Sequence, residues 1–189
     1  METALGRRER KKRATRQAIA DEALRLFLDR GYDAVTVAEI AEAADVAVST
    51  VFKHFDSKEA IAFAHDPAVE AELVRAVAQR DPGVSIARSL RDFLVDSPAL
   101  VAGPAEFVAL VRATPALTAY SDRMWSRHAR AVADAIEDET GRPASDMHLR
   151  AWTRALVQIP SLVREEPDRE AAVDAAMDVL EHGWSPEPG

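Results

Sequence analysis

The stretch VTVAEIAEAADVAVSTVFKHFDSK, residues 35–58, decides the fold of this 189-residue chain. It contains two short helical patterns separated by a turn that is too tight to be a linker. In the first pattern, Thr36 and Glu39 have the spacing of a capping box, in which each side chain bonds the other residue's backbone N–H. A helix over residues 36–44 is predicted because apolar residues follow at helical spacing, at Val37, Ile40, Ala41 and Ala44.

The second pattern follows the turn at residues 45–47 and predicts a helix over 48–55. Asp45 is a residue type that tolerates a left-handed backbone in such a turn. Val51 and Phe55 are four residues apart and can reach a core, whereas a second face is polar or cationic, with Ser49, Thr50, Lys53 and His54. Two helices joined by so short a turn, the second with an exposed polar face, fit the major groove of DNA. A purely structural helical hairpin is the alternative interpretation of this pattern.

The order of residue types closely resembles the DNA-binding domain of the TetR family of bacterial repressors. Thr-Val-x-x-Ile-Ala-x-x-Ala occupies residues 36–44, and Ser-Thr-Val-Phe-Lys-His-Phe-x-Ser-Lys-Glu occupies residues 49–59. Together with a preceding helix that ends at Gly31, the resemblance covers about the first third of the chain. It implies a three-helix DNA-binding domain whose first helix supports the other two and touches phosphates with its N-terminus.

The polar face and the resemblance together define the candidate DNA contacts. Four positions depart from the family pattern: Asp45 replaces the usual glycine, Ala47 a common capping serine, Ser49 a frequent glycine and Phe52 a tyrosine that reaches a phosphate. These changes predict a strained turn and a weakly capped second helix. Lys58 is a phosphate contact by resemblance. The candidate contacts are Arg13, Arg16, Thr36, Ser49, Thr50, Phe52, Lys53, His54 and Lys58.

The N-terminal residues carry a concentrated positive charge. The chain has a net charge of −8, but residues 1–65 contain eleven basic and eleven acidic residues, so the acidic excess belongs to residues 66–189. Such a distribution attracts phosphates at the N-terminal end. Residues 1–11 are expected to form a flexible basic arm, and a first helix is expected over 12–30. The basic cluster comprises Arg7, Arg8, Arg10, Lys11, Lys12, Arg13 and Arg16.

The rest of the chain shows only helical signals, so the predicted fold class is all-α. Asp56 or Ser57 is expected to cap a short helix that ends before Pro67 and acts as a lever between two domains. These are a DNA-binding domain over 12–65 and a larger ligand-binding and dimerisation domain over 66–183, before a frayed tail over 184–189. Proline and glycine breaks place further helices at 67–80, 84–95, 103–113, 116–140, 145–164, which Pro160 interrupts, and 168–182.

The second domain is expected to bind an effector. Large apolar side chains can line a cavity between helices, although ordinary core packing is the better explanation of each one taken singly. Trp125 and His128 share a helix face. The segment 107–138 resembles regulators of mycofactocin-type gene clusters, which implies an acyl-thioester or lipid-like effector. The candidate ligand contacts are Phe93, Phe107, Leu110, Met124, Trp125, His128 and Trp152.

Composition excludes several other classes of protein. The chain has no cysteine, and its five histidines show no metal-binding spacing, so no metal, no cofactor and no enzymatic activity are expected. No signal peptide or membrane span is visible, which predicts a cytoplasmic protein. One recognition helix reads few base pairs, so a homodimer on a palindromic double-stranded operator is expected, with the last two helices as its interface by resemblance. The predicted function is a ligand-responsive transcriptional repressor, and the alternative is a helical protein-interaction module.

Overall fold

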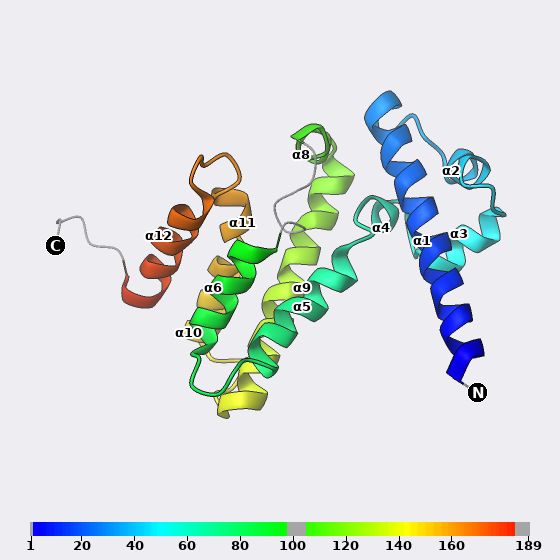
Figure 1. The fold of residues 1–189 in the computed structure, drawn as a ribbon. Helices are drawn as coiled ribbons and strands as arrows, with labels where there is room; N and C mark the ends of the chain where they lie inside the picture. The colour runs from blue at the N-terminus through cyan, green and yellow to red at the C-terminus, as the bar shows by residue number, and fades with distance from the viewer. Residues whose placement is uncertain (1, 98–104, 184–189) are drawn as a thin grey trace. The chain divides into compact units, whose positions relative to one another are not determined.

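The computed structural model describes residues 2–97 and 105–183, and within these residues all regular secondary structure is helical (Figure 1). The all-α fold class predicted from the sequence is therefore confirmed. The chain divides into two compact units, one formed by residues 1–65 with 104–120 and the other by residues 66–103 with 121–189. In the described residues no helix combines the length and the apolar character that crossing a bilayer requires. The predicted tail over 184–189 lies outside the described residues.

The first unit is built around α1, which contacts α2, α3, α4 and α8. Its core contains the fully buried side chains of Ile19, Phe27 and Val51. Burying these apolar groups supplies the main driving force for packing α1 with α2, α3 and α4, the last three of which are each too short to be stable alone. The helices are α1 (Glu2–Arg30), α2 (Val37–Ala43), α3 (Val48–His54), α4 (Lys58–Ala62), α8 (Ala105–Ala113) and the first residues of α9 (Pro115–Thr140).

The ends of these helices follow from local residue chemistry. Gly31 has a φ of +82°, and its N–H donates to the carbonyl of Phe27 at 3.0 Å, so α1 ends at the expected glycine, in a left-handed conformation. The hydroxyl of Ser57 accepts from the N–H of Ala60 at 3.2 Å, which makes Ser57, and not Asp56, the cap of α4.

The basic N-terminus is not an arm in the structure. The expected flexible segment over 1–11 is corrected for residues 2–11, which continue α1 as one helix from Glu2 to Arg30. Arginine, lysine, glutamate and leucine all have high helix propensity, and the segment contains no proline. The local preference for helix therefore extends the first helix in spite of the repulsion between its positive charges.

The first unit also recruits a segment from later in the chain. Residues 105–120, which were expected in the second domain, pack with the first unit, where Leu117 is fully buried. The ring of Phe63 lies 5.6 Å from that of Phe107 and 5.3 Å from that of Tyr120. The added apolar surface enlarges the core of a small helical domain, which would otherwise bury little of its surface.

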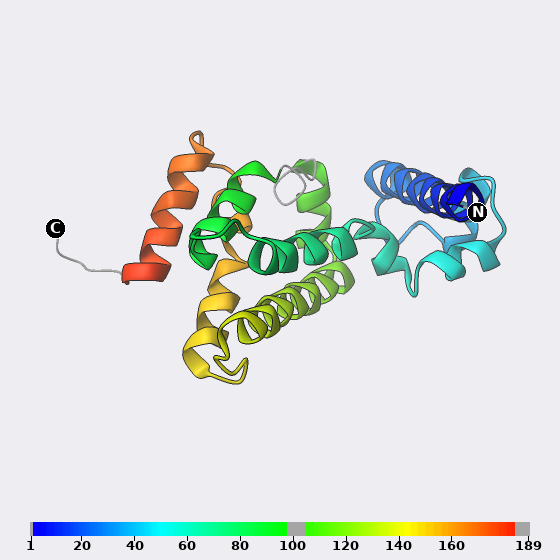
Figure 2. The same ribbon diagram turned by 60° about the horizontal axis from the view of Figure 1, so that its bottom comes forward.

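The second unit contains α5 (Asp66–Ala78), α6 (Ile86–Asp96), the rest of α9, α10 (Met147–Leu156), α11 (Ile159–Leu162) and α12 (Arg169–His182). Helix α6 packs against both α5 and α12, and α10 packs against α12 (Figure 2). The core includes Leu90, Val132 and Leu156. The predicted interruption at Pro160 is confirmed, because α10 ends at Leu156 and α11 begins at Ile159.

Candidate nucleic-acid interface

A complete capping box fixes the start of α2. The N–H of Thr36 donates to Glu39 at 2.8 Å, and the hydroxyl of Thr36 accepts from the N–H of Glu39 at 3.2 Å. Arg30 also donates to the Glu39 carboxylate at 2.7 Å. These bonds, those from Thr36 first, lower the pKa of Glu39 to about 2. Thr36 was a candidate DNA contact, but its hydroxyl already takes part in the cap.

The turn between α2 and α3 has the predicted strain. Asp45 has a φ of +51° and is the only non-glycine residue with a positive φ among the described residues. The N–H of Val46 donates to the carbonyl of Ala41 at 2.9 Å, which closes the turn. Ala47 precedes α3 and makes no side-chain cap bond, as predicted. A glycine at position 45 would relieve a cost of about 1 kcal/mol, because it has no Cβ.

Helix α3 has one face in the core and one face in solvent. Val51 is fully buried and Phe55 is nearly so. Ser49 and Lys53 are exposed, and Thr50 is half-buried on the same helix. The helix thus has the two faces that the sequence predicted, with its outer face free to enter a groove.

Two apolar side chains also lie on the outside of α3. Phe52 is 54% exposed and Val48 is 41% exposed. Val48 was not among the DNA contacts predicted from the sequence. Its position outside the buried Val51–Phe55 pair could have indicated that it is exposed. Apolar groups on a recognition helix can contact the methyl group of thymine in the major groove. The reading surface is therefore a mixture of hydroxyl, ammonium and apolar groups.

Arg16 was predicted to contact DNA, but the structure uses its guanidinium within the first unit. One nitrogen donates to the carbonyl of His54, and the other donates to the carbonyl of Ala64 at 3.0 Å. The guanidinium carbon lies 4.0 Å from the centroid of the Phe55 ring. Arg16 therefore joins α1 to the ends of α3 and α4 and positions the recognition helix. A phosphate contact of Arg16 stays a prediction.

Lys58 also serves the fold. Its ammonium group donates to the carbonyl of Tyr32 at 2.5 Å and lies 3.9 Å from the centroid of the Tyr32 ring. Burial lowers the pKa of Lys58. The side chain stabilises the junction between the end of α1 and the start of α4. Its implied phosphate contact, like that of Arg16, remains a prediction.

His54 lies at the end of α3 in a half-buried position that disfavours its charged form. Burial first, and then the charges of Arg16 and Lys12, lower its pKa from the ordinary value of 6.5. The buried Nδ1 atom of His54 has no hydrogen-bond partner among the described residues. A proton added there would have no acceptor.

Acidification below about pH 6.5 is therefore expected to destabilise the first unit through His54. Because the folded-state pKa is below the ordinary value, the unfolded state binds the proton more readily. The stabilising contribution is present above pH 6.5 and is lost as the pH falls through the folded-state pKa. Urea unfolding followed by circular dichroism at several pH values should give a shallower pH dependence for His54→Gln than for the unmodified protein. Equal slopes would contradict this role of His54.

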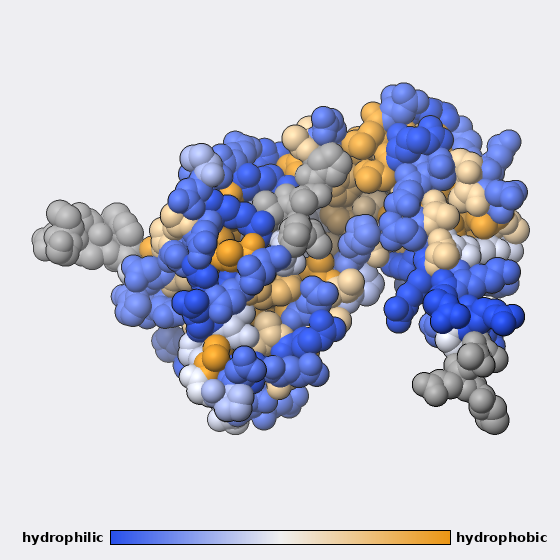
Figure 3. All heavy atoms as spheres, viewed as in Figure 1, coloured by the Kyte–Doolittle hydropathy of each residue, from blue (hydrophilic) through white to orange (hydrophobic). Residues whose placement is uncertain are grey.

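The basic residues of α1 form an exposed surface on its N-terminal part. Arg13 and every charged residue from position 7 to position 12 are exposed, and Figure 3 shows this part of the helix as strongly hydrophilic. No acidic residue except Glu9 interrupts the series. A regular helix presents these charges at fixed spacing, so they can contact phosphates without first becoming ordered.

The candidate ligand contacts do not form one group. Phe107 and Leu110 pack in the first unit, whereas Phe93, Trp125 and Trp152 pack against the core of the second. Met124 is buried in the second unit as well. Phe107 and Leu110 belong to the core that surrounds α1, and the cavity expected from the sequence stays a prediction.

His128 and Trp125 do lie together in the second unit. Their rings are 5.1 Å apart and nearly perpendicular. His128 is fully buried, and its Nε2 lies 2.6 Å from Asp66, which also accepts from Arg127. The Nδ1 of His128 has no partner among the described residues. His128 therefore bonds the first residue of α5 to α9, and its role in ligand binding stays a prediction.

A short helix pair with a capped first helix, a tight turn and an exposed second helix defines a helix-turn-helix DNA-binding protein, a regulator of transcription. Residues 19–64 match the family model described as bacterial regulatory proteins, tetR family. Its DNA-binding region, residues 19–64, is therefore that of a TetR-family transcriptional regulator.

Two related proteins are similar to this chain over different lengths. The HTH-type transcriptional regulator TcmR of Streptomyces glaucescens is 44% identical over 78 residues, which are 41% of this chain and 34% of TcmR. The match thus spans about a third of TcmR. A Mycobacterium tuberculosis protein, MftR, whose name assigns it to the regulation of mycofactocin biosynthesis, is 28% identical over 96% of both chains.

Solved structures show the same fold. The transcriptional regulator FadR of Bacillus subtilis, solved in complex with stearoyl-CoA, matches with a TM-score of 0.58 at 15% identity. The match covers 89% of this chain and 99% of FadR. The likeness extends over both units, so the helical arrangement after residue 65 also has a known counterpart.

Proposed function

We propose that the protein is a repressor that binds a palindromic double-stranded DNA operator as a homodimer and is released by a small-molecule effector. The observation that carries the proposal is α3, which is held in place by Val51 and Phe55 and exposes Ser49, Phe52 and Lys53. A helix of seven residues reads only a few base pairs. Useful specificity therefore requires a second half-site and a second copy of the chain. Because its target is chromosomal DNA, the protein acts in the cytoplasm.

The second unit is the source of the dimer interface in this proposal. Leu162 on α11 is 67% exposed and Val179 on α12 is 44% exposed. Large apolar side chains exposed near the C-terminal helices are what a two-fold interface would bury. These two residues support the last helices as the interface, since Leu156 and Met177 are already buried within one copy.

The effector acts through the second unit. We assign it an apolar or acyl-type chemistry, which is supported by the name of MftR and by the stearoyl-CoA complex of FadR. Trp125 and His128 on α9 remain the candidate contacts. An effector that competed for His128 would weaken its bond to Asp66 and change the restraint on the start of α5. It shifts the protein between two states only by its different affinity for them.

Replacing Lys53 with alanine is expected to weaken operator binding about fivefold to tenfold. The exposed ammonium group on α3 has no other task in the described structure, so its loss removes a DNA contact and leaves the fold intact. The log–log dependence of affinity on salt should become less steep by about one. Genomic footprinting supplies the DNA fragment, and fluorescence anisotropy at several salt concentrations measures the affinity.

Arg88→Ala is the matched control for this experiment. Arg88 is an exposed cation of the second unit, so its replacement changes the net charge equally but should leave both affinity and salt slope unchanged. Normal operator binding by Lys53→Ala would remove α3 as the reading helix. Weak, salt-independent binding by the unmodified protein would instead favour the helical protein-interaction module.

A further inference from the structure

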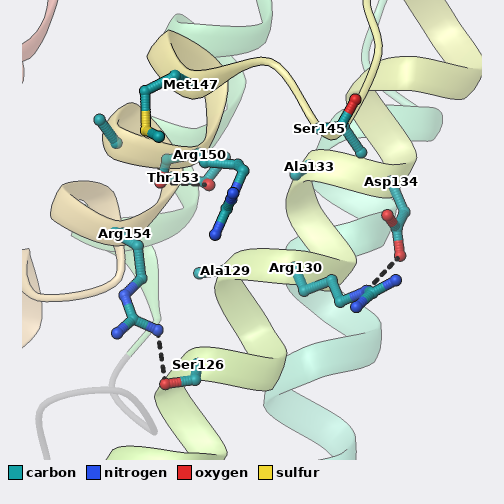
Figure 4. Close-up of a pocket in the computed structure, with 12 residues that line it drawn as sticks. Ser126, Ala129, Arg130, Ala133, Asp134, Ser145, Met147, Arg150, Thr153 and Arg154 are labelled. Atoms are coloured by element: carbon teal, nitrogen blue, oxygen red, sulfur yellow. Dashed lines mark hydrogen bonds and ion pairs between the residues drawn. The ribbon is translucent and has the colours of Figure 1, made fainter.

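The second unit contains an open cavity between α9 and α10 with a volume of about 660 Å³ (Figure 4). This volume is in the range of small-molecule sites. None of the seven candidate ligand contacts selected from the sequence lines it. The walls are formed by Ser126, Ala129 and Arg130 of α9 and by Met147, Arg150 and Arg154 of α10, among others.

The charge of this cavity is opposite to that of the surrounding chain. Its lining contains three arginines and one acidic residue, Asp134, which gives a net charge of +2. Residues 66–189 as a whole carry the entire net charge of −8. A local cluster of cations in an acidic domain focuses a positive potential on one concave surface. The cavity therefore favours an anion.

The arginines of the cavity are weakly paired. Arg154 donates to the hydroxyl of Ser126 at 2.7 Å, and Arg130 lies 3.8 Å from Asp134 with both side chains largely exposed. Arg150 has no ion pair within the described part of the chain, and Figure 4 shows its side chain directed into the cavity, toward Ala129. By contrast, Arg91 of the same unit is held by Asp174 at 2.6 Å.

The rest of the lining is uncharged and consists of alanines, Met147 and the hydroxyl residues Ser126, Ser145 and Thr153. Ala129 and Ala133 on α9 are buried, and their small side chains leave space at the bottom of the cavity. Met147 stands at the wall with 68% of its surface exposed. A flexible thioether adapts to ligands of different shape. An apolar body bound here would cover the methionine and lie on the alanines.

We propose that this cavity binds a small organic anion. Its carboxylate or phosphate group accepts hydrogen bonds from Arg150 and Arg154, which present planar donors suited to either group. Its apolar part lies against Ala129, Ala133 and Met147. The site is separate from the Trp125–His128 pair, and the proposal does not depend on DNA binding.

Methionine-methyl NMR can locate such a ligand, because the chain has four methionines and Met147 alone lines the cavity. Hexyl phosphate, hexanoate and hexanol are the probes, and Met147→Leu assigns the signal. We expect the two anions to shift the Met147 signal saturably and hexanol to bind at least about tenfold more weakly. The tighter of the two anions identifies the head group. Absence of a saturable shift with both anions would overturn the proposal, as would equal binding of hexanol.

Arg150→Gln combined with Arg154→Gln should reduce the affinity for the better anion at least about tenfold. Arg75→Gln, which removes an exposed cation of the same unit outside the cavity, should change it less than about twofold. Unchanged binding by the double variant would overturn the site. If the double variant instead changes the oligomeric state in sedimentation, and no probe binds the unmodified protein, a second copy of the chain covers the cavity and the proposal fails. None of these readouts involves DNA, so operator binding is tested separately.

Discussion

Replacing Phe27 with alanine is expected to lower the unfolding free energy of the first unit by about 3–5 kcal/mol and to abolish operator binding. Phe27 is fully buried, and its ring lies 5.2 Å from that of Tyr32. The ammonium group of Lys58 lies 5.6 Å from its centroid. Removing the ring creates a cavity where the end of α1 meets the start of α4, and neighbours held by hydrogen bonds cannot collapse into it.

The two units can be followed by different signals. Trp125 and Trp152 lie in the described part of the second unit, so their fluorescence reports on that unit. Circular dichroism reports on helices of both. In urea, Phe27→Ala should lose part of its helical signal early, while the tryptophan transition stays in place. Leu28→Ala, at a neighbouring position that is 38% exposed, is the control and should cost about 1 kcal/mol or less. A loss below about 1 kcal/mol in Phe27→Ala would contradict the described core.

The sequence predicted the parts of this fold that depend on neighbouring residues. The Thr36–Glu39 capping box, the left-handed Asp45 and the uncapped Ala47 each involve contacts within about one helical turn, where spacing determines geometry. The buried pair Val51 and Phe55 follows from the same periodicity. The two helices and their turn could thus be predicted from local pattern, whereas their interpretation as a DNA-binding pair needed the resemblance to the TetR family.

Contacts between distant residues could not be predicted in this way. Arg16 bonds backbone carbonyls 38 and 48 residues away, and Lys58 bonds one 26 residues away. From sequence alone, a basic residue in a DNA-binding segment is interpreted as a phosphate contact. Only the folded chain shows that a backbone carbonyl lies within its reach. Phe107 reached the core of the first unit for the same reason, since only the folded chain places it on Phe63.

The bonds that Arg16 and Lys58 make within the first unit change which residues are expected to contact DNA phosphates. The charged groups of Arg16 and Lys58 bond backbone carbonyls that support α3, whereas Lys53 and the exposed cations of α1 remain available for the proposed phosphate contacts. Because several such cations lie on one regular helix, their contributions should depend on salt together. In this proposal, the residues that cap the helices and the residues that contact DNA are therefore different members of the segment 35–58.

Replacing Asp66 with alanine is expected to destabilise the second unit by about 3 kcal/mol. The Asp66 side chain is 7% exposed and lies 2.6 Å from the Nε2 of His128, which is fully buried. Without the carboxylate, the buried Nε2 of His128 would keep only the Glu70 carboxylate, at 3.8 Å, and Nδ1 already lacks a partner among the described residues. Leaving a buried polar group unpaired costs more than the pair itself contributes.

A double-mutant cycle separates this cost from the loss of packing. His128→Leu alone leaves Asp66 with Arg127 as its remaining partner, and the double variant Asp66→Ala/His128→Leu removes both members of the buried bond. The double variant should be more stable than the sum of the single changes predicts, by about 1.5–3 kcal/mol. Tryptophan fluorescence in urea measures each variant. Glu72→Ala, which removes an exposed carboxylate of α5 that lies 4.0 Å from Arg75, should cost at most about 1 kcal/mol. Strict additivity in the cycle would mean that His128 and Asp66 do not restrain the start of α5 together, and an effector could then not act through their bond.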